Sequence, residues 1–246
     1  MKLDELAAYF NGLLKVGEVK DSPNALNGLQ VENSGEVTKI AVAVDACEAV
    51  LRRAVDAKAD LLIVHHGLFW SGLGPVTGTA YRKLRLALDG NLAVYSAHLP
   101  LDAHPVFGNN ALLCDALGLG EWHMPFLDIG WRVEQETARE ELTLRLEKAV
   151  GGRVQLAAGG PAVARKIGVV TGGAGGEIFK AAGEGVDTFI TGEGPHWSYT
   201  AAEELGVNLF YAGHYATETF GVKALGKHAQ EKFGLPWEFL DHPTGL

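Results

Sequence analysis

The chain has 246 residues, of which 47% are hydrophobic and 21% are charged, as is ordinary for a globular protein with a sizeable core. Its formal net charge of -9 disfavours a sequence-independent grip on nucleic-acid phosphates, which needs clustered lysine and arginine, although a local basic patch stays open. No apolar run is long enough to cross a bilayer, and the first residues lack the apolar core of a signal peptide. Cys47 and Cys114 form no CxxC pair, so we expect reduced thiols and a cytoplasmic protein.

Short apolar runs alternate with helical patterns along the chain. The runs lie near residues 40–44, 61–64, 92–95, 167–170, 188–190 and 209–211. This alternation is the βαβ signature of largely parallel sheets that are covered by helices. The sequence therefore predicts an α/β protein.

Part of this pattern occurs twice. Residues 39–67 align with residues 166–194 without a gap, with seven identities in 29 positions, and both strands and the helix between them fall in register. A single-residue gap then matches Tyr95 with Tyr211 and His98 with His214. We interpret the match as an internal duplication, and chance similarity between two βαβ units is the alternative. The irregular stretch 121–137 predicts the boundary, which gives domains of residues 1–124 and 125–246.

The adjacent residues His65 and His66 end the second apolar run, directly before Gly67. Open α/β sheets bind ligands at the carboxyl ends of their parallel strands, so imidazoles at this point are candidate metal ligands. Neighbouring side chains on a strand point to opposite faces, so both rings reach one ion only where the strand bends, and two nearby ions would be simpler. A pair of structural histidines is the alternative.

The third run leads to His98 and, four residues later, to Asp102. Pro100 and Pro105 exclude a continuous helix, so we expect Asp102 on a stiffened loop. Loops at this edge of a sheet carry function more often than packing.

The second half offers a similar pair, because His214 and Glu218 follow the last apolar run. Residues four apart on a helix share a face, so these two side chains can reach one point as a chelate. An unrelated surface pair is the alternative. Glu193 aligns with His66 in the duplication, which suggests a supporting or proton-transfer role, and a surface glutamate is the competing interpretation.

The glycine-rich block at residues 171–177 follows a strand and could cradle an anion with backbone amides. It has neither the P-loop ending nor the dinucleotide spacing, so we favour a tight turn between strand and helix. We expect the remaining histidines to be solvated or structural; they are His104, His123, His196, His228 and His242.

Imidazole nitrogen and carboxylate oxygen together suit zinc, iron, manganese or cobalt, and they suit calcium poorly. A carboxylate can bridge two ions a few Å apart, and such a pair activates a shared water at neutral pH. Asp102 and Glu218 are the candidate bridges. A site for one metal is the alternative.

Taken together, seven short stretches resemble one family, the dinuclear-metal hexameric proteins known as NGG-interacting-factor-three-like or YbgI-like, often labelled GTP cyclohydrolase type 2 homologues. The stretches span nearly the whole chain in order, at residues 27–32, 64–67, 98–102, 108–110, 171–173, 190–193 and 213–218.

The resemblance implies two similar α/β domains with two divalent metal ions in the cleft between them, in subunits that form a hexameric ring. The implied ligands are His65, His66, Asp102, His214 and Glu218, with His98 close by. Two positions depart from the family pattern, and they put the surroundings of a substrate in doubt. Tyr215 replaces a frequent histidine, and residues 219–220 lack an arginine that is common before a glycine.

These residues predict a metal-dependent hydrolase in which a water attacks a carbon or phosphorus centre while His98 or Glu193 moves protons. The family label would make a nucleotide, GTP, the substrate, although no guanine-reading motif is identifiable in the sequence. The alternative is a non-enzymatic metal-binding or scaffold protein that engages protein or nucleic acid, and nothing in the sequence points to a membrane partner.

Overall fold

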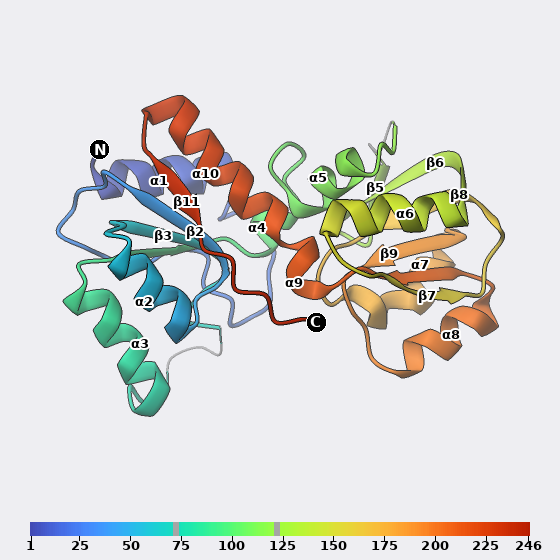
Figure 1. Cartoon of the computed structure of the whole chain (residues 1–246), viewed down its shortest axis with the longest axis horizontal. Helices are drawn as coiled ribbons and strands as arrows, with labels where there is room; N and C mark the ends of the chain where they lie inside the picture. Colours follow the sequence, from blue (N-terminus) through green and yellow to red (C-terminus); the bar gives the residue numbers. More distant parts are fainter. Residues whose placement is uncertain (71–73, 121–123) are drawn as a thin grey trace. The chain divides into compact units, whose positions relative to one another are not determined.

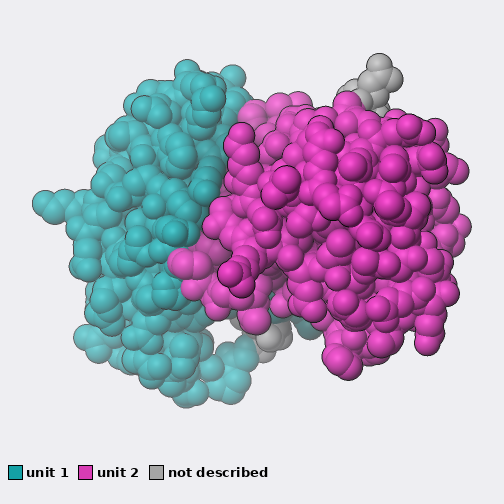
Figure 2. All heavy atoms as spheres, turned by 45° about the vertical axis from the view of Figure 1, so that its right-hand side comes forward, with its two compact units in different colours: residues 1–101, 221–242 teal, residues 102–220, 243–246 magenta. Residues whose placement is uncertain are grey.

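The computed structural model describes residues 1–70, 74–120 and 124–246, and its contacts divide the chain into two compact units (Figure 2). Unit 1 comprises residues 1–101 and 221–242, and unit 2 comprises residues 102–220 and 243–246. Each unit contains one sheet with helices on both faces, so the predicted α/β class is confirmed. Among the described residues, no helix is both long and apolar enough to cross a membrane.

Unit 1 has a five-stranded sheet in the order β1-β4-β3-β2-β11. All neighbouring strands are parallel except β1, which pairs antiparallel with β4. The strands are β1 (Gly28–Val31), β2 (Ile40–Asp45), β3 (Leu61–His66), β4 (Ala93–Ser96) and β11 (Trp237–Phe239). The central strands β2 and β3 are almost entirely buried, as expected for parallel strands covered on both sides.

Helices cover both faces of this sheet (Figure 1). On one face, α2 (Glu48–Asp56) and α3 (Gly78–Asp89) pack against alternate residues of β2, β3 and β4. On the other face lie α1 (Leu3–Leu13) and α10 (Thr219–Phe233), where Phe10 contacts Tyr95 and Gly226 lies against Val42. The one-turn helix α4 (Leu99–Asp102) follows β4.

Unit 2 has a six-stranded sheet in the order β5-β6-β8-β9-β10-β7, in which β8, β9 and β10 are parallel. The strands are β5 (Met124–Phe126), β6 (Gly130–Ala138), β7 (Gln155–Ala158), β8 (Val163–Val169), β9 (Thr188–Thr191) and β10 (Asn208–Tyr211). One face is covered by α5 (Asn109–Ala116) and α6 (Arg139–Val150). The other face is covered by α7 (Ile178–Gly183) and α8 (Trp197–Leu205). The 3-10 turn η1 (Ala174–Glu177) precedes α7, and α9 (His214–Thr217) follows β10.

The ladders of the two sheets support the internal duplication. Ile40 pairs with Leu61 across β2 and β3, and the aligned residues Ile167 and Thr188 pair across β8 and β9. In both sheets, an antiparallel strand, β1 or β7, adds to the outer side of the third parallel strand. Aligned aspartates also play similar parts: Asp60 accepts the backbone N–H groups of Thr38 and Lys39 just before β2, and Asp187 accepts those of Arg165 and Lys166 within β8.

The predicted match of Tyr95 with Tyr211 is wrong by one residue. Val64 pairs with Ser96, and the aligned residue Thr191 pairs with Tyr211, so Tyr211 corresponds to Ser96. Successive strand residues point to opposite faces, so the shift changes the environment. Tyr95 is fully buried, whereas Tyr211 is partly exposed.

The unit boundaries also differ from the predicted division into residues 1–124 and 125–246. Helix α5 packs on β6 and β8, so residues 102–120 belong with unit 2. Helix α10 and strand β11 return to unit 1, where β11 pairs with β2. Hydrophobic periodicity marks these elements, but it does not say which of two similar sheets they join.

Candidate metal centre

Three histidines gather at the carboxyl edge of the sheet in unit 1. His65 and His66 end β3, and His98 follows β4. One ring nitrogen from each lies within 4.8 Å of the others, and the ring centroids of His65 and His66 are 4.7 Å apart. The two adjacent imidazoles therefore converge at the strand end, and they form with His98 a group that could hold a metal ion.

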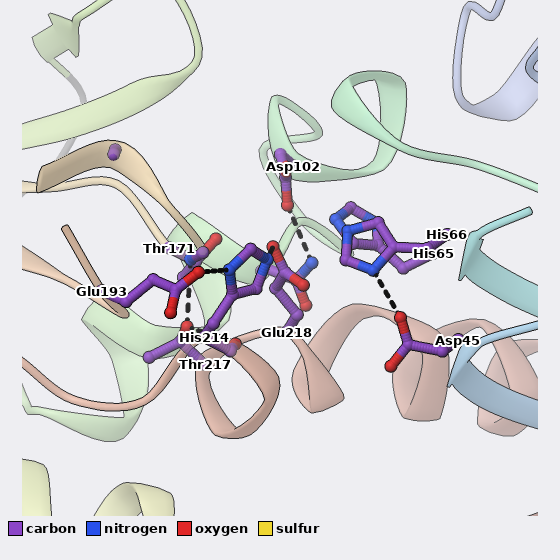
Figure 3. Close-up of polar contacts among 12 residues, drawn as sticks. Asp45, His65, His66, Asp102, Thr171, Glu193, His214, Thr217 and Glu218 are labelled. Atoms are coloured by element: carbon purple, nitrogen blue, oxygen red, sulfur yellow. Dashed lines mark hydrogen bonds and ion pairs between the residues drawn. The ribbon is translucent and has the colours of Figure 1, made fainter. Parts of the chain in front are cut away.

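Each of these rings is held through its Nδ1 atom. His65 Nδ1 donates to the carbonyl oxygen of Ala97 at 2.9 Å, because that oxygen can only accept. His66 Nδ1 lies 2.9 Å from Asp45 Oδ1, and His98 Nδ1 lies 2.8 Å from Asp21 Oδ1 (Figure 3 shows the first pair). A proton on Nδ1 leaves the Nε2 lone pair as the ligand atom, as is usual for metal-binding histidines.

Asp21 and Asn27 are functional candidates that the sequence analysis missed. Burial alone would raise the pKa of the Asp21 carboxyl, but hydrogen bonds from His98 and Asn27 outweigh it and lower the pKa to about 2. Asn27 Oδ1 also accepts the backbone N–H of His98 at 2.7 Å. These residues lie in a loop with no periodic pattern, so only their contacts reveal that they fix the position of His98.

In unit 2, the predicted pair of His214 and Glu218 is in contact. His214 Nε2 lies 3.1 Å from Glu218 Oε1, and His214 Nδ1 lies 2.8 Å from Glu193 Oε1 (Figure 3). The hydrogen bond with Glu218 raises the pKa of His214 to about 9, with a further contribution from Glu193, although burial opposes the rise. Glu193 is therefore a partner of the candidate ligand His214 rather than an isolated surface glutamate.

The backbone of the glycine-rich block lies close to the side chains of His214 and Glu218. Gly172 has a φ of +69°, and a Cβ atom there would lie 2.2 Å from Glu218 Oε1. Outside the block, Gly192 after β9 also approaches closely, because a Cβ atom there would lie 2.7 Å from His214 Cα. The block forms the tight turn that the sequence analysis favoured, and its glycines leave room for the carboxylate and the imidazole.

Asp102 ends the one-turn helix α4, so the expectation of a loop at this residue is wrong. Pro100 fits because it lies in the first turn, where its missing N–H would have no partner in the helix. The Asp102 side chain is buried, and its Oδ1 accepts a hydrogen bond of 2.8 Å from Asn109 Nδ2. The next residue along the chain, Asn110, accepts the backbone N–H of Thr171 with its side-chain oxygen.

The other histidines have separate surroundings. His104 Nδ1 accepts backbone N–H groups at the start of the following turn, and His228 Nε2 lies against the Tyr9 hydroxyl. His196 and His242 are exposed, whereas His123 lies outside the described residues.

Comparison with known proteins identifies relatives over the full length. The model of the DUF34/NIF3 family (NGG1p interacting factor 3) matches residues 1–244. A Deinococcus radiodurans protein named GTP cyclohydrolase 1 type 2 homolog is 39% identical over 249 residues, which cover 99% of this chain and 94% of the relative. An Archaeoglobus fulgidus protein of the same name is 39% identical over 252 residues, which cover 100% of both chains.

Solved structures agree with this assignment. The crystal structure of TTHA1606 from Thermus thermophilus has a TM-score of 0.94 and 41% identity, with 100% of both chains covered. A structure of protein ybgI, described as of unknown function, has a TM-score of 0.93 and 37% identity over 100% of both chains. The resemblance that the sequence motifs predicted is thereby confirmed, and the chain belongs to the DUF34/NIF3 family.

Proposed function

We propose that this protein binds two divalent metal ions and hydrolyses a small molecule, with a nucleotide as the first candidate substrate. The main observation behind this proposal is that the Nδ1 atoms of the candidate histidine ligands are already held by hydrogen-bond partners. His66 and His214 each have Nδ1 against a carboxylate, and His65 has Nδ1 on a backbone carbonyl, so Nε2 of each ring would be the atom that holds a metal. The proposed ligand set is His65, His66, Asp102, His214 and Glu218.

This donor set fits zinc, iron, manganese or cobalt, because it combines borderline imidazole nitrogens with carboxylate oxygens. Bound ions of this kind supply Lewis acidity and lower the pKa of a water toward neutrality. The chain itself supplies groups that hold and move protons. His98 can accept a proton at Nε2 while Asp21 holds its Nδ1, and Glu193 can steady the proton on His214 Nδ1.

The substrate proposal rests on the names of the relatives. Curated relatives are named GTP cyclohydrolase 1 type 2 homolog, which makes GTP the first compound to test. From the family resemblance we also propose a homohexameric ring, which a measurement of molar mass in solution tests directly.

Metal analysis and an assay of turnover test this function together. Freshly purified protein should contain two metal equivalents per chain and should hydrolyse GTP or another nucleotide. The double variant Asp102→Ala with Glu218→Ala should lose both metal and turnover. The matched control is Asp56→Ala with Glu203→Ala, which removes two carboxylates elsewhere and should change neither.

Other results would redirect the assignment. One metal equivalent per chain would favour a one-metal site, for which the three histidines of unit 1 are a sufficient set. Full metal content without turnover across a broad panel of nucleotides and related esters would favour a storage or scaffold role.

A further inference from the structure

Unit 2 contains a cavity of about 450 Å³, whose lining includes Glu193, a residue that the proposed function already uses. It lies where β9 leads into α8 and where β10 ends, at the carboxyl edge of the parallel strands. Its wall includes Glu193, Tyr199, Thr200 and Tyr211. Cavities of this size at this edge are where α/β sheets bind small molecules. We call this cavity the acceptor pocket.

The hydroxyl groups of the wall donate their protons within the fold. Ser198 Oγ donates to the carbonyl oxygen of Pro195 at 2.6 Å, so its contact of 2.7 Å with Tyr211 Oη has Tyr211 as the donor. Burial raises the pKa of Tyr211, which keeps this hydroxyl protonated at neutral pH. Its oxygen can still accept a hydrogen bond from a molecule in the pocket.

The same holds for the two hydroxyls on α8. Tyr199 Oη donates to the carbonyl oxygen of Leu156 at 3.3 Å, and Thr200 Oγ1 donates to that of Trp197 at 3.1 Å. In this arrangement both hydroxyl oxygens can act as acceptors toward a further partner. Two further lining side chains, those of Gln155 and His196, have donor groups, and both residues are exposed.

Glu193 adds a negative charge to this wall. A carboxylate has about four lone-pair positions, and the contact between Glu193 Oε1 and His214 Nδ1 at 2.8 Å uses one of them. The others can accept from a molecule in the pocket. Phosphate or carboxylate groups are disfavoured there, because they would meet like charge and further acceptors.

We propose that the acceptor pocket binds an edge of adjacent N–H donors, of the amidine or guanidine type. Such an edge forms two parallel hydrogen bonds with a carboxylate, and it occurs both on 2-amino-4-oxo heterocycles and on alkyl guanidinium groups. Because Glu193 also contacts His214, the bound edge would place the rest of the molecule beside that residue. This role in orienting a substrate rests on the proposed function, whereas binding itself does not.

Calorimetry with three probes tests the proposal on the full-length protein, with and without metal. Guanosine carries the complete edge, inosine lacks its 2-amino group, and agmatine carries a guanidinium group without a heterocycle. If the source is a heterocycle, guanosine should bind at least about ten-fold more tightly than inosine, because one good bidentate pair discriminates by that much. If the source is an alkyl guanidinium, agmatine should bind and guanosine should not.

Variants then locate the binding site. Glu193→Gln should weaken the preferred probe at least about ten-fold, and Tyr211→Phe, which removes one acceptor and little volume, should weaken it about three-fold or more. The control Glu203→Gln makes the same chemical change at an exposed residue of α8 and should bind like the parent. Circular dichroism confirms that each variant is folded.

The outcomes separate this proposal from the proposed function. Probe binding that depends on Glu193 and Tyr211 supports the pocket even if no turnover is found. The proposal is overturned if guanosine and inosine bind equally and agmatine does not bind, or if both variants bind the preferred probe as tightly as the parent. Nucleotide hydrolysis that continues in that case would leave the metal chemistry standing.

Discussion

Replacing Gly172 with alanine should damage the candidate metal centre from a position that donates no ligand. The residue has a φ of +69°, and a Cβ atom there would lie 2.2 Å from Glu218 Oε1. Real Cβ contacts lie beyond 3.0 Å, so the carboxylate oxygen must retreat. Glu218 is buried, and its oxygen lies 3.1 Å from His214 Nε2, so this retreat breaks the pairing of the two candidate ligands.

The magnitude follows from two separate costs. An alanine in the left-handed region costs about 1 kcal/mol relative to glycine. Loss of a buried, charge-assisted hydrogen bond between Glu218 and His214 adds about 1.5 to 3 kcal/mol. Gly172→Ala should therefore lower the free energy of unfolding by about 2.5 to 4 kcal/mol. Metal affinity should fall about 10-fold or more, because the displaced carboxylate would no longer be in place to bind an ion.

Gly206→Ala is the matched control. Gly206 has the same φ of +69°, and a Cβ atom there would meet nothing within 4 Å. This variant should lose only about 1 kcal/mol and should keep its metal affinity. Urea unfolding of metal-free protein measures the first quantity, and titration with zinc or cobalt measures the second. Equal losses of stability in the two variants, or unchanged metal affinity in Gly172→Ala, would refute the crowding argument.

Three further predictions concern the residues that hold the imidazoles and the metal itself. The pKa of Asp21 is lowered to about 2, so its contribution to stability, about 1 to 2 kcal/mol, is present above pH 4 and lost as the pH falls toward 2. Asp21→Asn should flatten that dependence in acid unfolding curves, and a curve as steep as the parent's would contradict this account. Asp45→Ala should weaken metal binding about 10- to 100-fold, because it removes the acceptor that holds His66 Nδ1. The amide oxygen of Asp45→Asn can still accept that hydrogen bond, so this variant should bind metal more tightly than the alanine variant in the same titration. Removing metal with a chelator should lower the melting temperature. Adding zinc at about 100 times its dissociation constant should restore about 2.7 kcal/mol of stability. A melting temperature that does not change with metal would argue against metal binding by the folded state.

The sequence was informative about elements whose signal is local. Apolar runs at residues 40–44 and 61–64 predicted two buried strands, and the structure places β2 and β3 there. The chelate spacing of His214 and Glu218 was also readable, since residues four apart on a turn of helix meet on one face.

Features that depend on distant pairing were not readable in the same way. The sequence alignment matched Tyr211 with Tyr95, whereas the strand pairing matches it with Ser96. A loop of different length precedes β10, and sequence identity alone does not determine which residues pair across neighbouring strands. Asp102 was expected on a loop, although a proline is tolerated in the first turn of a short helix.

The sequence by itself determined the α/β class, the repeated strand pattern and the identity of the candidate ligands, because each leaves a mark within a few neighbouring residues. Tertiary structure alone decided which carboxylate holds which imidazole. Asp21 lies 77 residues from His98, and Glu193 lies 21 residues from His214, yet each pair is 2.8 Å apart. Such contacts arise when strand ends and loops are packed together on a common sheet edge, and no local periodicity encodes them.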